Sequence, residues 1–508
     1  MHALNADHEH VELRWILLAC LPGIWLSLSM PVFAQEAYYW TYAQHPDCSY
    51  YDHPPMVAWL IWTGTQLLGD GAIGVRLLTM LCGLGTLLVG MHLLRAFGAS
   101  ANAVRAWLLF SSCAPVLIAT RFLANPDPPL CLFWLASMAA LWRARDGKLG
   151  WWILAGVFTG CALLSKYTAA FLGLSGVLVL LFDAPMRRQL RRPGPWLAVL
   201  TALLVFLPVV LWNIHNDFES FRFQTSHRFG NTRWSAHWFF QFVGGQFGLL
   251  HPAIALMLPF ATLWLARRAL SRTGERDPRA LWLLAFGLPM PLFFLANAMW
   301  MQVKPNWIAP AYLPLMLGVA WWWSESGVQD RRPRLSLSAR RAAICTMPLL
   351  ALAPLISLWP QHRGSSWTGW TEIATCAEKW EEKIDPEDHT EGNVFFFAAD
   401  YKDAAQLTHG LRLHEQAHPE EPRVEAVLAQ NALGHSALQF DHWDAPQQHL
   451  GQDAIFVLPR ASERAALVGE MRARFVSAEM VEQVHIDRFG IEVFSADIFV
   501  CRSYKGAH

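Results

Sequence analysis

The first stretch of the chain whose residues could do chemistry combines acids, tyrosines and a histidine. It holds Glu36, Tyr38 and Tyr39 in QEAYYW and continues to Asp52 and His53 in YYDHPP. A carboxylate can take a proton from a reacting hydroxyl group, and a histidine can either carry a charge or hydrogen-bond while neutral. These residue types suit general base catalysis and the binding of a polar ligand. Anchoring at a membrane interface is the plainer explanation for the tyrosines.

Three further stretches place single charges beside prolines or aromatic residues. Asp127 lies in NPDPP, Lys166 and Tyr167 lie in LLSKYT, and Lys304 and Asn306 lie in KPNW. Ionisable groups at membrane depth are costly, which makes each charge a functional candidate. Each also has a structural explanation, because Asp before proline is a common helix start and a lysine can extend its amine to the interface.

Composition indicates that these residues belong to a membrane protein. Of the 508 residues, 54% are hydrophobic and only 16% are charged, against about 25% charged in a typical soluble domain. This composition argues against an ordinary soluble enzyme, a disordered protein and a disulfide-rich secreted scaffold. We therefore expect a polytopic α-helical membrane protein.

Apolar stretches predict about eleven transmembrane helices, because a helical span needs about 20 apolar residues. They cover residues 15–33, 75–94, 106–120, 130–141, 151–164, 169–182, 196–212, 247–266, 281–296, 307–323 and 342–358. Residues 36–44 and 56–68 are predicted to form helices that lie on the membrane. A signal-peptide cleavage site after Ala34 is an alternative, and cleavage there would remove the first helix.

Basic residues predict the orientation of these helices. With the N-terminus in the cytoplasm, 20 Lys and Arg residues lie in cytoplasmic segments and 7 lie in outside segments, as the positive-inside rule requires. Residues 1–359 then form a membrane domain with outside loops at 34–72 and 214–246. The second loop holds Arg222 and Arg228, which suit either an anion site or a merely solvated loop.

Residues 360–508 differ in character from the rest of the chain. They carry 13 basic and 24 acidic residues, and this acidity argues against nucleic-acid binding. Short apolar runs predict strands at 393–398, 424–428, 454–458, 491–493 and 498–500, with helices at 402–411 and 462–475. The alternation predicts a small extracytoplasmic α/β domain. Cys376 and Cys501 are its only cysteines, and the sequence leaves open whether they form a disulfide.

Six stretches, taken in order, resemble a known family. The chain resembles bacterial integral-membrane glycosyltransferases of the GT-C fold, related to protein O-mannosyltransferases and lipid A aminoarabinose transferases. The matching stretches are EAYYW (36–40), YYDHPP (50–55), NPDPP (125–129), LLSKYT (163–168), LWNIHNDFESFRFQ (211–224) and KPNWIAPAY (304–312).

The resemblance implies a reaction at the outer face of the bacterial cytoplasmic membrane. A sugar passes from a polyprenyl-phosphate carrier to an acceptor, which can be lipid A, another glycolipid or a protein. A lipid phosphate is a good leaving group, so positioning and charge stabilisation can carry much of the barrier. No cofactor is certain from the sequence. A divalent metal stays open as an alternative, although no residue spacing indicates a site for it.

The resemblance also implies roles for the candidate residues. The carrier phosphate needs cations, and the available ones are Lys166, Arg222, Arg228 and Lys304. The other residues implied in substrate binding are Tyr38, Tyr39, Asp52, His53, Tyr167 and Asn306.

The general base is where the chain departs from the family. Relatives usually have an Asp-Glu pair at the end of the first helix, with the Asp as base, whereas this chain has Gln35 before Glu36. Either Glu36 or Asp127 takes over this role, or activity has been lost.

Two other classes of function remain open from the sequence. A non-catalytic relative that binds the carrier or the acceptor is favoured by Gln35. A transporter of an anionic solute would also use intramembrane charges, but the inverted repeats typical of that class are not evident in the sequence.

The Lys and Arg distribution yields a test of topology. We expect a reporter or an accessible cysteine placed in residues 360–508 to be detected outside the cytoplasm, because an odd number of spans exports that segment. The same reporter placed after Arg188, in a predicted cytoplasmic connection, serves as the control. Detection of residues 360–508 in the cytoplasm would contradict the predicted orientation.

Overall fold

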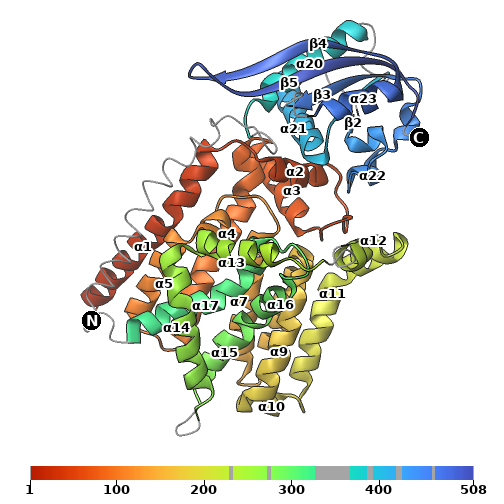
Figure 1. Cartoon of the computed structure of the whole chain (residues 1–508). Helices are drawn as coiled ribbons and strands as arrows, with labels where there is room; N and C mark the ends of the chain where they lie inside the picture. The colour runs from red at the N-terminus through yellow and green to blue at the C-terminus, as the bar shows by residue number, and fades with distance from the viewer. Residues whose placement is uncertain are drawn as a thin grey trace. The chain divides into compact units, whose positions relative to one another are not determined.

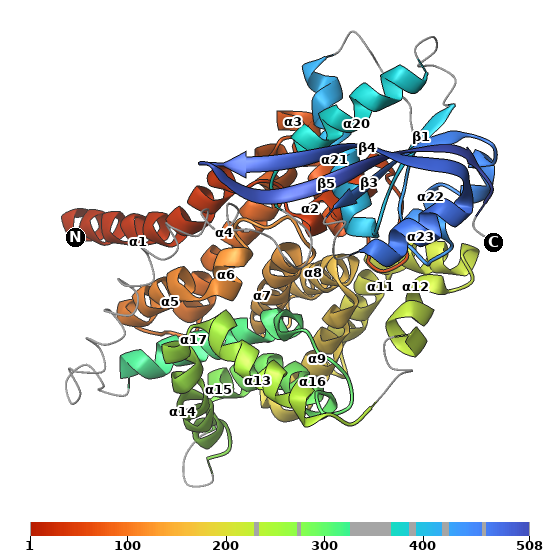
Figure 2. The same cartoon turned by 45° about the horizontal axis from the view of Figure 1, so that its top comes forward.

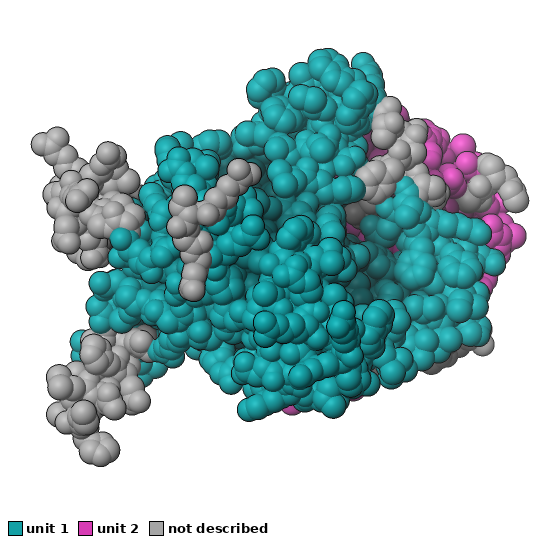
Figure 3. All heavy atoms as spheres, turned by 90° about the horizontal axis from the view of Figure 1, so that it is seen from below, with its two compact units in different colours: residues 1–27, 53–60, 76–351 teal, residues 28–52, 61–75, 352–508 magenta. Residues whose placement is uncertain are grey.

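The computed structural model describes residues 2–227, 233–271, 276–325, 367–385, 393–418, 426–459 and 464–506. The chain forms two compact units, which Figure 3 distinguishes by colour. The first unit comprises residues 1–27, 53–60 and 76–351, and the second comprises residues 28–52, 61–75 and 352–508. Two segments of the predicted outside loop 34–72 therefore belong to the same unit as the C-terminal part of the chain.

The first unit is helical throughout its described residues (Figure 1). Its elements, some of which extend past the unit boundary, are α1 (His2–Ser29), α4 (Ala72–Ala96), α5 (Ala101–Cys113), α6 (Pro115–Ala119), α7 (Asp127–Ala144), α8 (Leu149–Ser165), η1 (Tyr167–Ala170), α9 (Phe171–Phe182), α10 (Ala184–Gln189), α11 (Pro193–His215), α12 (Glu219–Arg222), the π-helical turn η2 (Phe223–His227), α13 (Ala236–Leu250), α14 (Pro252–Ala269), α15 (Pro278–Gly287), α16 (Pro289–Asn297), η3 (Pro305–Ile308) and α17 (Ala309–Glu325).

Several helices have the length and composition of membrane spans. Among the described residues, three are long and apolar enough on their own: α4, α11 and the α15–α16 pair, Pro278–Asn297. The number rises to five if each of two bent helix pairs counts as one span. Helix α11 exposes Trp196, Leu203 and Leu204, as expected of a lipid-facing surface. The predicted span at 342–358 lies outside the described residues, so a total of about eleven stays a prediction.

Prolines break two of the segments that were predicted as single spans. Ala114 separates α5 from α6, and His251 separates α13 from α14. Each of these residues precedes a proline, which disfavours helical geometry at the preceding position and cannot donate a backbone hydrogen bond. The α13–α14 pair is bent by 105°, so residues 247–266 do not form one straight helix. Helix α13 begins at Ala236, within the predicted outside loop 214–246.

Close helix packing fixes the position of α8, which leads into one of the candidate stretches. Gly156 and Gly160 of α8 face α11, and a Cβ atom at Gly160 would lie 2.5 Å from Cβ of Val205. Small residues four apart permit this kind of close approach between helices in membranes. The same helix packs along α7, so the start of α7 and the end of α8 are held by one rigid group of helices.

The second unit combines a mixed sheet with helices. Its elements are α2 (Ala34–Gln44), α3 (Met56–Leu68, shared with the first unit), α20 (Trp370–Ile384), β1 (Val394–Ala398), α21 (Tyr401–Ala417), β2 (Val427–Leu428), η5 (Gln430–Leu433), α22 (Phe440–Trp443), η6 (Pro446–His449), β3 (Asp453–Pro459), α23 (Ala465–Arg474), β4 (Phe475–Arg488) and β5 (Ile491–Tyr504). The helices predicted at 36–44 and 56–68 are confirmed as α2 and α3.

The sheet has the strand order β2-β1-β3-β5-β4, and Figure 2 labels four of its strands, β1, β3, β5 and β4. Strand β1 pairs in parallel with β2 and β3, whereas β5 pairs antiparallel with β3 and β4. The predicted small α/β arrangement is confirmed for the described residues. Strand β4 was missed because its sequence, FVSAEMVEQVHIDR, mixes charged and apolar residues and is largely exposed along its length. The two runs predicted at 491–493 and 498–500 belong to one long strand, β5.

The two faces of this sheet hold separate apolar cores, and they separate the two cysteines. Cys376 of α20 packs with the core that contains Ile498 and Val500, whereas Cys501 packs with Phe499 and Met471. Successive residues of a strand point to opposite faces. Both cysteines are free thiols in the structure, so the disulfide that the sequence left open is not formed. Burial raises the pKa of the Cys376 thiol to about 11.

This separation predicts the result of thiol labelling. We expect iodoacetamide to modify both Cys376 and Cys501 once the protein is unfolded without a reductant, because no bond joins them. Peptide mass spectrometry would measure the two adducts, and a sample reduced before labelling is the control. A crosslinked peptide pair that appears only without reductant would contradict the arrangement of the sheet.

Candidate functional site

Asp127 begins helix α7 and is largely buried. Its backbone N–H donates to Oδ1 of Asn125 at 2.9 Å, and Pro128 and Pro129 follow in the first turn, where proline is well tolerated. The sequence NPDPP therefore sets the helix start, but Asp127 is the first helical residue and its side chain does not cap the helix. The residue is only 7% exposed.

Lys166 meets Asp127 from the end of α8. The helix ends at Ser165, and Lys166 has an extended backbone before η1 begins at Tyr167. The Lys166 Nζ atom lies 2.6 Å from Oδ1 of Asp127, and each side chain is 10% exposed. This is a nearly buried ion pair between the ends of two packed helices.

Asn306 completes the cluster from the turn η3. Its Nδ2 group donates to Oδ2 of Asp127 at 3.0 Å, so both carboxylate oxygens accept a hydrogen bond. Burial of an ion pair is tolerated only when further hydrogen bonds satisfy the charged groups. An ammonium has three donors, and Asp127 is the hydrogen-bond partner found for Lys166 Nζ among the described residues. The remaining donors of Lys166 can serve an anionic ligand.

Tyr167 points into the neighbouring turn at the end of α11. Its hydroxyl lies 2.6 Å from Oγ of Ser220, and its ring packs edge-on against Phe221. The turn is held by Asn213, whose Oδ1 accepts the Phe221 N–H at 3.2 Å. The stretch WNIHNDFES thus fixes Tyr167 directly beside Lys166 in the chain.

The other predicted phosphate ligands have different surroundings. Arg222 and Lys304 are exposed, in contrast with Lys166. Arg228 lies outside the described residues. His53 is half-buried at the start of a segment of the first unit.

In the second unit, two tyrosines bind one carboxylate. The hydroxyls of Tyr38 and Tyr42 both donate to Oδ1 of Asp52, and Tyr42 is a residue that the sequence analysis did not select. Tyr401 of α21 packs against Tyr38, with ring centroids 4.8 Å apart. Burial, assisted by the negative charges of Asp52 and Asp400, raises the pKa of Tyr401 to about 12. Tyr39 is buried in the same aromatic group.

Glu36 has a structural role that the sequence did not predict. Its Oε2 atom accepts the backbone N–H of Phe33 at 2.9 Å, which stabilises the first turn of α2. The side chain is buried and belongs to the second unit, whereas Asp127 belongs to the first. The two candidate general bases therefore have different structural settings.

Asp70 is a buried acid that the sequence analysis missed. It accepts hydrogen bonds from Trp40 Nε1 at 2.7 Å and Gln416 Nε2 at 2.7 Å, and its Oδ2 lies 3.4 Å from Nε of Arg412. One feature of the sequence could have indicated the contacts of Asp70. Residues 34–72 contain no Lys or Arg, so a buried acid in this segment must pair with a cation from another part of the chain. Among the residues that the structure describes, no group of three or more His, Cys, Asp or Glu side chains could hold a metal ion.

The family comparison matches the part of the chain that carries the ion pair. Residues 52–212 match the family model described as dolichyl-phosphate-mannose-protein mannosyltransferase. This range includes Asp52, Asp127 and Lys166, and it ends before Arg222 and Lys304.

Similar proteins with known activities act on lipid A or use a polyprenyl-phosphate sugar. A lipid A galacturonosyltransferase, RgtD, from Rhizobium johnstonii is 28% identical over 65% of this chain and 68% of its own length. An undecaprenyl phosphate-alpha-4-amino-4-deoxy-L-arabinose arabinosyl transferase from Pseudomonas fluorescens is 30% identical over 56% of this chain. The match spans 50% of that relative's length.

Solved structures extend the likeness to nearly the whole fold. The structure of ArnT from Cupriavidus metallidurans in the apo state has a TM-score of 0.59 at 17% identity, covering 97% of this chain and 98% of ArnT. The chain is thus similar in sequence to these glycosyltransferases and shares its fold with ArnT. The ArnT structure bound to undecaprenyl phosphate gives the same TM-score. The GT-C-like fold that the sequence predicts for this chain is therefore confirmed. The roles of its individual residues remain predictions.

The buried ion pair predicts a defined pattern of stability. We expect Lys166→Met to destabilise the protein by about 3–5 kcal/mol, because it leaves the Asp127 carboxylate buried without its cation. The double variant Lys166→Met/Asp127→Asn should recover part of this loss, since neither charge then remains. Thermal unfolding of the purified protein measures both effects.

Lys148→Met is the matched control, because Lys148 is exposed at the other end of α8. Its unfolding temperature should stay close to that of the wild type. An unchanged unfolding temperature for Lys166→Met would show that the pair does not stabilise the fold.

Proposed function

We propose that the protein is a glycosyltransferase that moves a sugar from a polyprenyl-phosphate-linked donor to an acceptor at the outer face of the cytoplasmic membrane. The observation that supports this most directly is the meeting of Asp127, Lys166 and Asn306, which come from three of the stretches that resemble the family. The named activities of the relatives supply the class of donor.

Lys166 is the proposed ligand of the donor phosphate. Its ammonium keeps donors for phosphate oxygens while Asp127 fixes its position. During transfer, the bond between the sugar C1 and the phosphate oxygen breaks and a bond from C1 to the acceptor oxygen forms. The departing polyprenyl phosphate gains negative charge, which a preorganised ammonium stabilises. Arg222 and Lys304, which are exposed, and Arg228 remain proposed as further cations. Tyr167 and Asn306 remain proposed as neighbours that orient the donor.

The acceptor hydroxyl must lose its proton, and one of two carboxylates is proposed to take it. Asp127 already accepts hydrogen bonds on both oxygens, which favours a positioning role for it. Glu36 accepts the Phe33 N–H through Oε2. The sugar is proposed to be a hexosyl or pentosyl group, and the acceptor lipid A, another glycolipid or a protein. Tyr38, Tyr39, Asp52 and His53 stay proposed as residues that bind substrate.

The proposal includes an arrangement in the membrane. Residues 1–359 form the membrane domain, with about eleven spans and outside loops at 34–72 and 214–246. Residues 360–508 lie outside the cytoplasm as the α/β domain. The distribution of Lys and Arg supports this orientation.

A non-catalytic relative is the second candidate, and one residue favours it. Gln35 stands where relatives usually have the catalytic Asp, and an amide does not act as a general base. Such a protein would still bind the lipid carrier through Lys166 but would not transfer the sugar.

Carboxylate variants separate these possibilities. We expect Glu36→Gln or Asp127→Asn to lower transfer by about 10²–10⁴-fold, the contribution of a general base. Mass spectrometry of lipid A, core glycolipid and envelope proteins from cells with each variant measures the product, and transfer to the acceptor found there is then timed in vitro. Asp146→Asn is the matched control, because Asp146 is exposed and lies in a predicted cytoplasmic connection.

Gln35→Asp tests the second candidate directly. In an active enzyme with a relocated base the change should be neutral or harmful, whereas in an inactive relative it is the change that could restore transfer. Wild-type transfer rates in both the Glu36 and the Asp127 variants would overturn the proposed base. A wild-type protein without any product would favour the non-catalytic relative.

A further inference from the structure

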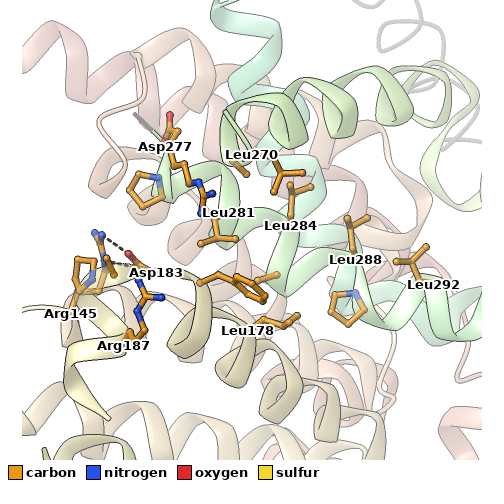
Figure 4. Close-up of a pocket in the computed structure, with 18 residues that line it drawn as sticks. Arg145, Leu178, Asp183, Arg187, Leu270, Asp277, Leu281, Leu284, Leu288 and Leu292 are labelled. Carbon is orange, nitrogen blue, oxygen red and sulfur yellow. Dashed lines mark hydrogen bonds and ion pairs between the residues drawn. The ribbon is translucent and has the colours of Figure 1, made fainter. Parts of the chain in front are cut away.

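A cavity of about 570 Å³ lies in the first unit. Asp127, Lys166 and Asn306 are not among the residues that line it. Its walls come from α9, α10, the end of α14, α15 and α16 (Figure 4). The volume falls within the range of about 300–1,000 Å³ typical of pockets that hold small molecules. None of the residues proposed for sugar transfer lines it.

One wall of the cavity is a row of leucines. Leu281, Leu284, Leu288 and Leu292 follow one another along α15 and α16, and Leu178 of α9 faces them across the cavity (Figure 4). From Leu281 to Leu292 the row is about 16 Å long at about 1.5 Å per residue. This length is close to half of the roughly 30 Å hydrocarbon thickness of a bilayer. The row therefore matches the depth of one membrane leaflet.

The other end of the cavity is polar, and its two carboxylates are already neutralised. Asp183 lies 2.8 Å from Nε of Arg145 and also accepts a hydrogen bond from Trp282 Nε1 at 2.9 Å. Asp277 caps α15 and lies 2.8 Å from Nη2 of Arg279. Figure 4 shows Arg145, Asp183 and Arg187 grouped at this end, with the leucines leading away from them.

Two arginines add positive charge beyond these pairs. Arg187 of α10 and Arg276, just before α15, both line the cavity. Within the described ranges, neither forms an ion pair with an Asp or Glu side chain; the pairs there use Arg145, Arg268 and Arg279. The polar end of the cavity therefore carries an excess of positive charge.

We propose that this cavity binds an anionic glycerophospholipid, with one acyl chain along the leucine row and the phosphate at Arg187 and Arg276. Basic pockets between membrane helices on the cytoplasmic side suit anionic lipid headgroups, and the Lys and Arg distribution predicts that this end faces the cytoplasm. A row one leaflet deep fits an acyl chain of a membrane lipid. This inference goes beyond sugar transfer and does not depend on it.

Lipid retention by the full-length protein tests the inference. The protein is placed in nanodiscs of equal phosphatidylglycerol and phosphatidylcholine, released into detergent, and its retained lipids are counted by native mass spectrometry. We expect the wild type to retain phosphatidylglycerol selectively. In Arg187→Gln/Arg276→Gln the selectivity should fall by about fivefold or more, since each basic residue near an anionic lipid contributes about 1 kcal/mol.

Arg188→Gln/Arg191→Gln is the matched control, because both arginines are exposed in the same connection but do not line the cavity. It should retain phosphatidylglycerol as the wild type does. A second variant, Leu284→Trp, fills the apolar wall and should reduce retention while both arginines remain. Unfolding temperatures verify that each variant is folded.

Three results of the lipid-retention measurement would overturn the inference. Equal retention of phosphatidylglycerol and phosphatidylcholine by the wild type would show that the cavity does not select an anionic headgroup. An equal loss in the Arg188/Arg191 variant would reveal only a general surface attraction. Loss of added undecaprenyl phosphate, rather than phosphatidylglycerol, from the Arg187/Arg276 variant would assign the cavity to the carrier instead.

Discussion

The need to neutralise a lysine inside an apolar bundle organises the first unit. Lys166 is nearly buried, and its ammonium requires a negative partner at hydrogen-bond distance. Asp127 provides it, but only because α7 begins and α8 ends at the same place. Close packing through Gly160 holds α8 in position, and η3 brings Asn306 to the second carboxylate oxygen. The ends of α7 and α8, the close contact at Gly160 and the turn η3 together determine the surroundings of the Lys166–Asp127 ion pair.

This convergence explains how much of the site the sequence could predict. Asp127, Lys166 and Asn306 were each selected as isolated groups whose burial would be costly. Their mutual contact was not predicted, because it depends on where helices end to within one turn. The consequence for function is a division of roles, in which Asp127 orients Lys166 and leaves part of the ammonium for a ligand.

The fold was predictable from the sequence where apolar runs are continuous. It was less predictable where a proline or a mixture of charged and apolar residues interrupts such a run. Helices α2 and α3 and strands β1 and β3 closely follow their predicted ranges. Breaks at Ala114 and His251 were missed because hydrophobicity averages over the proline that follows each of them. Strand β4 was missed because it is stabilised by pairing with β5 rather than by burial of its own side chains.

Asp70 shows a dependence between distant parts of the sequence. Its partners Arg412 and Gln416 lie in α21, more than 300 residues further along the chain, and Trp40 comes from α2. Exchange of the C-terminal part alone between two relatives would leave this acid facing side chains that did not evolve with it. A functional chimera would therefore need to take residues 28–52, residues 61–75 and the C-terminal part from the same parent protein.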